Sequence, residues 1–167
     1  MNRPAIHVDG DACPVRDEVF RVAERRGLEV HVVSNGARGV RLPDAPNIHR
    51  VIVAEGADAA DDWIVAHIRD GDVCVTADIP LAARCLAVGG RAIAPNGKVW
   101  DQNNIGGALA GREVSRHLRE LGAVTHGAAP FGQKQREHFL RALDAVLQAS
   151  AAGQPKSPPR ALPNFFD

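Results

Sequence analysis

Apolar and polar positions along the first hundred residues follow two different spacings. Where apolar residues alternate with polar ones or run continuously, and many are β-branched, the pattern predicts strands. Where apolar residues recur three and four positions apart, as Val15, Val19, Val22 and Ala23 do, the pattern predicts a helix. The strands predicted in this way cover residues 5–9, 28–34, 48–56, 72–78 and 91–95.

Three helices are predicted between these strands, at residues 15–27, 57–71 and 79–90. Gly27 and Gly71 stand where the first two should end, and Pro80 is tolerated in the first turn of the third. Short strands that alternate with helices are typical of a parallel sheet with helices on both faces. We therefore expect an α/β three-layer sandwich with a mostly parallel five-stranded sheet.

Beyond residue 100 the pattern becomes helical. Two helices are predicted at 104–121 and 132–149, and the last segment, 151–167, is rich in proline and is typical of a flexible tail. The expected organisation is a single α/β domain over residues 1–150, in which 104–149 forms a helical C-terminal addition.

Composition limits the classes of protein. A chain of 167 residues suits one domain, and 45% hydrophobic with 24% charged residues is typical of a globular protein. No apolar stretch approaches the roughly 20 residues that span a bilayer, and no signal peptide is recognisable. Cys13, Cys74 and Cys85 form no C-x-x-C pair, so we expect reduced, buried thiols. These features predict a cytoplasmic protein without a membrane partner.

The formal net charge is zero, so binding to nucleic acid would have to be local. Arg112, Arg116 and Arg119 recur four and three positions apart and share one helical face, and Lys134 and Arg136 come on the next predicted helix. Such a row is either solvated or, beside an acidic pocket, contacts the backbone of a nucleic acid such as RNA. No Walker loop or G-x-G-x-x-G is present, so no nucleotide cofactor is expected. An oligomer is compatible with the sequence.

Carboxylates come after three of the predicted strands, either directly or in the first two turns of the next helix. The six residues are Asp9, Asp11, Asp58, Asp61, Asp62 and Asp78. The carboxyl ends of parallel strands lie at one edge of the sheet, where ligands bind in this class of fold. We therefore expect these side chains to gather at a single edge.

Clustered carboxylates repel one another unless a proton or a cation neutralises them. Mg²⁺ or Mn²⁺ suits oxygen ligands of this kind, and such a site can activate water and neutralise charge on a phosphodiester. Helix capping is the competing interpretation, because Asp is favoured at helix N-termini regardless of function. Capping explains Asp11, Asp58, Asp61 and Asp78 about as well as a metal does, but it explains Asp9 less well.

Four segments in a fixed order, VDGDACPV, GADAADDWI, VTADIPLAARCL and NGKVW, resemble the YaiI/YqxD family of uncharacterised bacterial proteins. The resemblance covers about residues 5–146 and is echoed in PFGQKQREHFLRALD. That family is grouped with PIN-like domains, α/β sandwiches whose acidic edge binds Mg²⁺ or Mn²⁺ and cleaves RNA. The resemblance therefore implies a PIN-like fold and a metal-dependent ribonuclease.

The same resemblance implies roles for the individual acids. Asp9 corresponds to the first PIN acid and Asp78 to the third. Asp11 is an additional acid, serving as a further ligand or as the base that orients water. The second PIN acid falls among Asp58, Asp61 and Asp62.

Two other functions remain open. The segment IHVDGDACP also resembles the start of haloacid-dehalogenase phosphatases, with Asp9 as nucleophile, Asp11 as acid/base and Ser34 as the phosphate-binding hydroxyl. That scheme needs a basic residue shortly before the last acidic motif, whereas the first lysine of the chain is Lys98. A non-catalytic module that binds RNA or a protein is the other function, because fold does not decide function.

Overall fold

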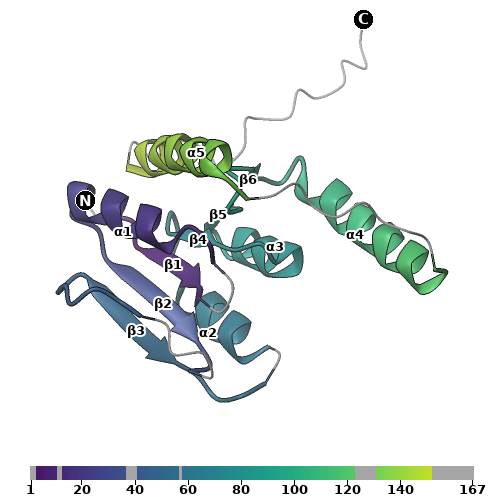
Figure 1. Cartoon of the computed structure of the whole chain (residues 1–167), viewed down its shortest axis with the longest axis horizontal. Coiled ribbons are helices and arrows are strands. Elements are labelled where there is room, and N and C mark those ends of the chain that lie inside the picture. The colour runs from purple at the N-terminus through teal and green to yellow at the C-terminus, as the bar shows by residue number, and fades with distance from the viewer. Residues whose placement is uncertain (1–2, 11–12, 37–40, 57, 123–130, 152–167) are drawn as a thin grey trace, which may run out of the picture.

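The computed structural model describes residues 3–10, 13–36, 41–56, 58–122 and 131–151, which form a mixed α/β fold with helices on both faces of one sheet (Figure 1). The strands are β1 (Ile6–Asp9), β2 (Val30–Ser34), β3 (Ile48–Ile52), β4 (Val73–Val75), β5 (Arg91–Ile93) and β6 (Val99–Trp100). The helices are α1 (Arg16–Arg26), α2 (Ala59–His67), α3 (Ile79–Ala87), α4 (Ile105–Glu120) and α5 (Gln133–Ala151).

The strand order is β3-β2-β1-β4-β5-β6, and every neighbouring pair is parallel except β5 and β6. From β1 the chain moves outward to β2 and β3, then returns to β4 on the other side of β1 and continues to β5. The direction of winding thus reverses between β1 and β4. In open α/β sheets the ligand site lies at such a reversal, at the carboxyl ends of the strands.

The expected three-layer α/β architecture is confirmed, but the prediction of five strands is wrong. The described residues form six strands, because Val99–Trp100 pairs antiparallel with β5. Gly97, at φ 92, lies in the turn that reverses the chain between the two strands. A strand of two residues has too few positions to show a period, so the hydrophobic pattern could not reveal it.

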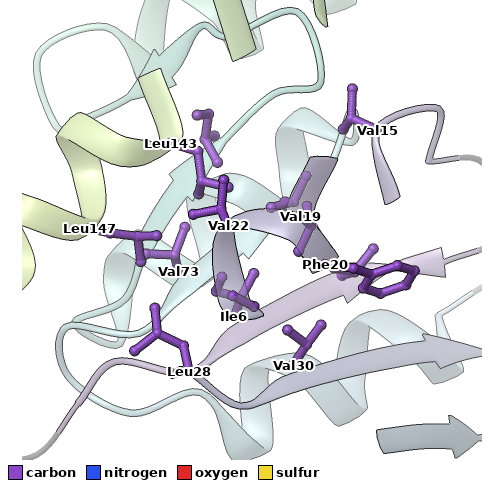
Figure 2. Close-up of a cluster of buried hydrophobic side chains, with 14 of the residues drawn as sticks. Ile6, Val15, Val19, Phe20, Val22, Leu28, Val30, Val73, Leu143 and Leu147 are labelled. Carbon is purple, nitrogen blue, oxygen red and sulfur yellow. The ribbon is translucent and has the colours of Figure 1, made fainter. Parts of the chain in front are cut away.

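One face of the sheet packs against α1 and α5. Alternating residues of β1, Ile6 and Val8, belong to this core. Figure 2 shows Ile6 beneath Val19 and Val22 of α1. Helix α5, which the sequence placed in an addition to the domain, contributes four buried residues to the same core: Phe139, Leu143, Val146 and Leu147. It is therefore part of the main core.

Helices α2 and α3 cover the opposite face. Val33 and Cys74 from the strands are buried there against Ile64 of α2 and Leu81 of α3. A third cluster joins α3 and β5 to Trp100 and to the start of α4. Because successive side chains of a strand point to opposite faces, Asp9 lies on the α2 and α3 side of the sheet.

Glycine ends α1 as predicted, whereas α2 is shorter than expected. Gly27 adopts the left-handed conformation at φ 66, and its N–H contacts the last carbonyls of α1. Helix α2 ends at His67, because Ile68 is extended and the N–H of Arg69 is bound by the Asp72 carboxylate instead of continuing the helix. Within the described part of the chain, no helix has the length and apolar character to span a bilayer. The predicted tail lies outside the described residues, except for Ala151, which ends α5.

Candidate active site

Two of the predicted acids lie on neighbouring strands at the point where the winding of the sheet reverses. Asp9 is the last residue of β1, and Asp78 comes after β4 as the residue that begins α3. Their strands pair directly, with Val8 opposite Val75. The fold therefore brings together two carboxylates that are separated by most of the first half of the chain.

Thr76 connects these two acids. Its hydroxyl donates a hydrogen bond of 3.0 Å to Oδ2 of Asp9 and accepts one of 3.0 Å from the backbone N–H of Asp78. The Thr76 side chain is buried, and both hydrogen bonds are partly buried. Oδ1 of Asp78 also accepts the N–H of Leu81, which confirms the capping interpretation for this residue.

Asp61, in the first turn of α2, is the helical acid on which this pair acts electrostatically. Burial raises the pKa of its carboxyl group from 3.8 to about 6, and the negative charges of Asp78, Asp9 and Asp58 contribute to this rise. The positive charge of Arg84 partly offsets this rise by lowering the pKa of Asp61. The charges at the ends of β1 and β4 therefore act on the Asp61 carboxyl group at this edge of the sheet.

The other two α2 acids are placed differently. Asp62 is exposed and forms an ion pair of 3.0 Å with Arg84 of α3, which ties the two helices together at the surface. Asp58 occupies the N-cap position of α2, but its side chain makes no capping hydrogen bond, and it is exposed. Of the three candidates for the helical acid, Asp61 is the one whose pKa is raised by burial and by the charges of Asp78 and Asp9.

The other residues singled out in the opening motif and at the end of β2 have different outcomes. Asp11 lies outside the described residues. Cys13 is buried, and burial raises the pKa of its thiol to about 11, so it is an unreactive thiol as expected. Ser34, the last residue of β2, is buried.

The predicted basic row divides into two groups. Arg112, Arg116 and Arg119 are exposed along α4, and Lys134 is exposed at the start of α5. Arg136 is engaged within the protein: Nη1 binds the buried Glu18 carboxylate at 3.0 Å and the carbonyl of Pro14 at 2.8 Å. This last residue holds α5 to the start of α1.

No three His, Cys, Asp or Glu side chains among the described residues approach closely enough to enclose a metal ion. The carboxylates at this edge form an open arrangement rather than a closed cage. A hollow of about 660 Å³ lies elsewhere, between α1 and residues 43–48, and contains none of the predicted acids.

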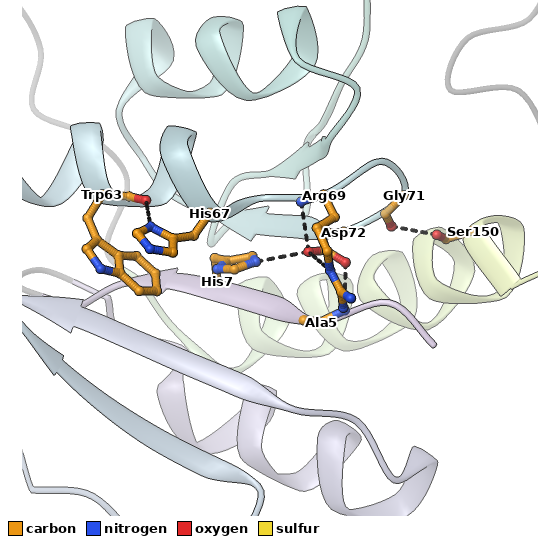
Figure 3. A network of polar contacts seen from close by, with 8 residues as sticks. All are labelled: Ala5, His7, Trp63, His67, Arg69, Gly71, Asp72 and Ser150. Carbon is orange, nitrogen blue, oxygen red and sulfur yellow. Dashed lines mark hydrogen bonds and ion pairs between the residues drawn. The ribbon is translucent and has the colours of Figure 1, made fainter. Parts of the chain in front are cut away.

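Sequence reasoning missed a row of imidazole rings on the same face of the sheet. His7, His31 and His49 stand in register across β1, β2 and β3, and their rings stack at 5.2 Å and 5.1 Å between centroids. Trp63 of α2 packs over this row, tilted against His7 and His31, and stacks on His67 (Figure 3). The signal was present in the sequence as a histidine at the second position of each of the three strands.

A buried carboxylate anchors one end of the row. Asp72 accepts hydrogen bonds from the N–H groups of Ala5 and Arg69 and contacts Nε2 of His7 at 3.1 Å (Figure 3). Burial alone would raise the pKa of Asp72, but these hydrogen bonds, that of His7 first, lower it below its ordinary value. The contact fixes the start of β1 against the turn between α2 and β4.

The model of the family described as "Uncharacterized BCR, YaiI/YqxD family" matches residues 7–149. The chain belongs to this family. It is 52% identical over 149 residues to a UPF0178 protein of Rhodospirillum rubrum, covering 89% of this chain and 99% of that protein. A UPF0178 protein of Azorhizobium caulinodans is 50% identical over 149 residues, covering 89% and 92% of the two chains. No solved structure matches the chain.

Proposed function

We propose that this protein is a divalent-metal-dependent hydrolase of RNA phosphodiester bonds, with its active site at the Asp9, Asp61 and Asp78 carboxylates. The observation that carries the proposal is the pairing of β1 with β4 at the reversal point of the sheet, where Thr76 links the Asp9 carboxylate to the backbone of Asp78. The raised pKa of Asp61, to which the charges of Asp78 and Asp9 contribute, is consistent with a third acid nearby. Helix capping accounts for the position of Asp78. It does not account for Asp9, which ends a strand, or for the raised pKa of the Asp61 carboxyl group.

The donor set fits Mg²⁺ or Mn²⁺. All three groups supply hard oxygen ligands, and their mutual repulsion is relieved by a cation. An open arrangement suits Mg²⁺, which keeps several waters and is held by one or two carboxylates together with substrate phosphates. When bound, the cation would acidify a water and neutralise charge on the scissile phosphate.

The chain's own residues prepare this site. Thr76 fixes the Asp9 carboxylate and the backbone at Asp78, so two of the acids keep their relative position without a ligand. Asp61 loses its proton more readily once a cation lies beside it, because the positive charge reverses the effect of its acidic neighbours. Asp58 stands at the exposed rim, where it would act through solvent, and Asp11 remains the candidate for an additional ligand or water-orienting base.

RNA would be contacted by the exposed cations of the C-terminal helices. Arg112, Arg116 and Arg119 of α4 and Lys134 of α5 can approach a phosphate backbone, since their side chains are exposed. Arg136 is left out of this surface because Glu18 and Pro14 already bind it.

The experiment combines Mn²⁺ titration calorimetry with cleavage of a labelled single-stranded RNA. The wild type should bind Mn²⁺ and cleave, and Asp9→Asn and Asp61→Asn should each abolish both. Asp62→Asn is the matched control, because it removes an adjacent carboxylate of the same helix that faces Arg84. It should leave binding and cleavage intact.

The remaining outcomes decide between the other functions. Release of phosphate from a phosphomonoester, without RNA cleavage, would replace the proposal with the phosphatase function, which depends on Asp9 and Asp11. Mn²⁺ or RNA binding without any hydrolysis would identify a binding module. Equal loss of metal binding in Asp61→Asn and Asp62→Asn would contradict the assignment of Asp61.

A further inference from the structure

The hollow of about 660 Å³ between α1 and residues 43–48 is called the α1 groove here. Phe20, Pro43 and Pro46 are among its apolar lining residues, and the two prolines are exposed. Figure 2 shows the Phe20 ring on the side of α1 away from Leu143 of α5. The groove therefore occupies the flank of α1 that α5 leaves uncovered.

Three charged residues of α1 line the same groove. Asp17, Arg21 and Glu24 are exposed, and none of them forms an ion pair with another described residue. Asp17 and Glu24 lie seven positions apart, or nearly two turns, so they stand on one side of the helix with their Cα atoms about 10.5 Å apart. The groove thus presents two negative charges along α1, and a single cation, Arg21, is not sufficient to neutralise both.

The described part of the chain ends close to this groove. In the last turn of α5, Oγ of Ser150 donates a hydrogen bond of 2.6 Å to the carbonyl of Gly71, just before β4. Ser150 and Arg3 border the same small hollow of about 140 Å³, and Nη1 of Arg3 donates a hydrogen bond of 3.2 Å to the carbonyl of Gly27. Gly27 in turn lines the α1 groove. Helix α5 therefore ends at the amino end of the sheet, with one arginine side chain between its last turn and the groove.

The segment 152–160, which follows α5, complements the groove in charge. It contains two cations, Lys156 and Arg160, and no acid, and the residues between the cations are Ser-Pro-Pro. Proline and the residue before it favour extended backbone, which rises about 3.1–3.4 Å per residue, so the two cations are about 12–14 Å apart along the chain. This spacing is close to that of Asp17 and Glu24, and the long side chains of lysine and arginine cover the difference.

The direction and the length of the segment fit as well. A chain that leaves α5 at the Gly27 end of the groove meets Glu24 first and Asp17 second. Residues 152–156 span up to about 17 Å when extended, which is sufficient to pass one arginine side chain and the single helical turn from Gly27 to Glu24. Lys156 therefore reaches the first of the two acids.

We propose that the α1 groove is an intramolecular docking surface for segment 152–160, with Lys156 beside Glu24 and Arg160 beside Asp17. The uncharged Ser-Pro-Pro sequence lies between the two ion pairs, beside the one cation of the groove, and its prolines pack on the apolar lining residues. Docking of this kind holds the end of α5 to the flank of α1 next to β3. The proposal is independent of the proposed function, since it uses none of the acidic residues of the candidate active site.

The first test is paramagnetic relaxation in the full-length chain. A nitroxide attached to Ser157→Cys in ¹⁵N-labelled protein should broaden the amide signals of Arg21 and Glu24. The amide of Arg84, on α3 at the opposite face of the sheet, is the reference and should keep its intensity. The three native cysteines are buried, so the label attaches to the introduced thiol. Unchanged signals of Arg21 and Glu24 overturn the proposal.

A mixed sample distinguishes docking within one molecule from docking onto another. ¹⁵N-labelled wild type is combined with an equal amount of unlabelled Ser157→Cys that carries the nitroxide. The signals of Arg21 and Glu24 in the wild type should keep their intensity, because each groove holds its own segment. Broadening as strong as in the first sample would show that the segment binds a second copy of the chain, and it would overturn intramolecular docking.

The third test exchanges the charges. In the labelled Ser157→Cys protein, Glu24→Lys should remove most of the broadening at Arg21, and addition of Lys156→Glu should restore it. A lysine near the carboxyl end of α1 is favourable for the helix dipole, so the fold should be retained. Glu137→Lys is the matched control, because it makes the same charge change at an exposed residue of α5 outside the groove, and it should leave the broadening unchanged. Broadening that survives Glu24→Lys, or that Lys156→Glu does not restore, contradicts the proposed ion pair.

Discussion

The hydroxyl of Thr76 donates a hydrogen bond of 3.0 Å to Oδ2 of Asp9, a residue 67 positions earlier in the chain. The same oxygen accepts the N–H of Asp78, so one side chain determines the relative position of the two acids at the ends of β1 and β4. Thr76 is buried, and it therefore acts as a positioning residue rather than as a ligand exposed to substrate.

Replacing Thr76 with Val should weaken both the fold and the proposed metal site. Valine has nearly the same shape but leaves the Asp9 oxygen and the Asp78 N–H without their partner, so we expect a loss of about 1–3 kcal/mol in the free energy of unfolding. Urea denaturation measures this loss, and calorimetry with Mn²⁺ should show weaker binding. Thr76→Ser keeps the hydroxyl and should recover most of the Mn²⁺ affinity. Equal Mn²⁺ affinity in Thr76→Val and the wild type would show that the bridge does not position the acids.

The sequence was sufficient to predict that Asp9 and Asp78 meet, because parallel strands place the residues at their carboxyl ends along one edge of the sheet. It was not sufficient to choose among the α2 acids. That choice depends on where the helix begins and on its rotation about its axis, which tertiary packing sets. Trp63 and Ile64 pack on their side of α2 against the sheet and α3, which leaves Asp61 half-buried and places Asp62 beside Arg84.

Other features escaped prediction for different physical reasons. The role of Thr76 rests on a single hydroxyl with no sequence period. The pairing of Arg136 with Glu18 joins residues 118 positions apart, and the charge pattern of α5 alone does not reveal a partner on another helix. A buried histidine such as His7 looks the same in sequence as an exposed one until its carboxylate partner is known.

Asp61→Asn should stabilise the metal-free protein at neutral pH. The pKa of Asp61 is about 6 in the folded state, above its ordinary value of 3.8, so the folded state holds the proton more tightly. Stability contributed by this group is therefore present below pH 3.8 and is lost as the pH rises through 6. The variant lacks this loss, so its melting temperature should exceed that of the wild type at about pH 7–8, and the difference should shrink toward pH 4.

Thermal melts in EDTA and in Mn²⁺ test this expectation. Mn²⁺ should stabilise the wild type and have little effect on Asp61→Asn. Asp62→Asn serves as control, because it removes an exposed ion pair with Arg84 worth at most about 1 kcal/mol. A melting temperature of Asp61→Asn below that of the wild type in EDTA at about pH 8 would contradict the proposed repulsion.

Substitution of Arg136 should affect mainly stability, whereas substitution of Lys134 should affect mainly RNA binding. Arg136→Ala leaves the buried Glu18 carboxylate without its cation and should lower the free energy of unfolding by about 1–3 kcal/mol. Lys134→Ala, on the exposed side of the same helix, should leave stability unchanged within about 0.5 kcal/mol. It should instead lower RNA affinity and reduce its salt dependence. Urea denaturation and fluorescence anisotropy with a labelled RNA measure the two effects, and the reverse pattern would remove Lys134 from the RNA-binding surface.

The histidine row should make the protein sensitive to acid through His31. Burial lowers the pKa of His31 below its ordinary value of 6.5, and the neighbouring His7 and His49 lower it further. Glu29 and Asp72 oppose this shift but do not cancel it. Below pH 6.5 the unfolded chain therefore takes up a proton at His31 more readily than the folded protein does. The free energy of unfolding consequently falls as the pH falls.

His31→Gln should reduce the dependence of the free energy of unfolding on pH below pH 6.5. Glutamine keeps a polar side chain between the outer rings but cannot take up a proton, so the free energy of unfolding of the variant should change less between about pH 7 and pH 5 than that of the wild type. Urea denaturation at several pH values gives both profiles, and His67→Gln is the control, because His67 lies at the exposed end of the ring cluster on α2. We assign the pH dependence of the free energy of unfolding to His31 only if its slope is smaller in His31→Gln and unchanged in His67→Gln. Parallel curves for the wild type and His31→Gln would place the acid sensitivity elsewhere in the molecule.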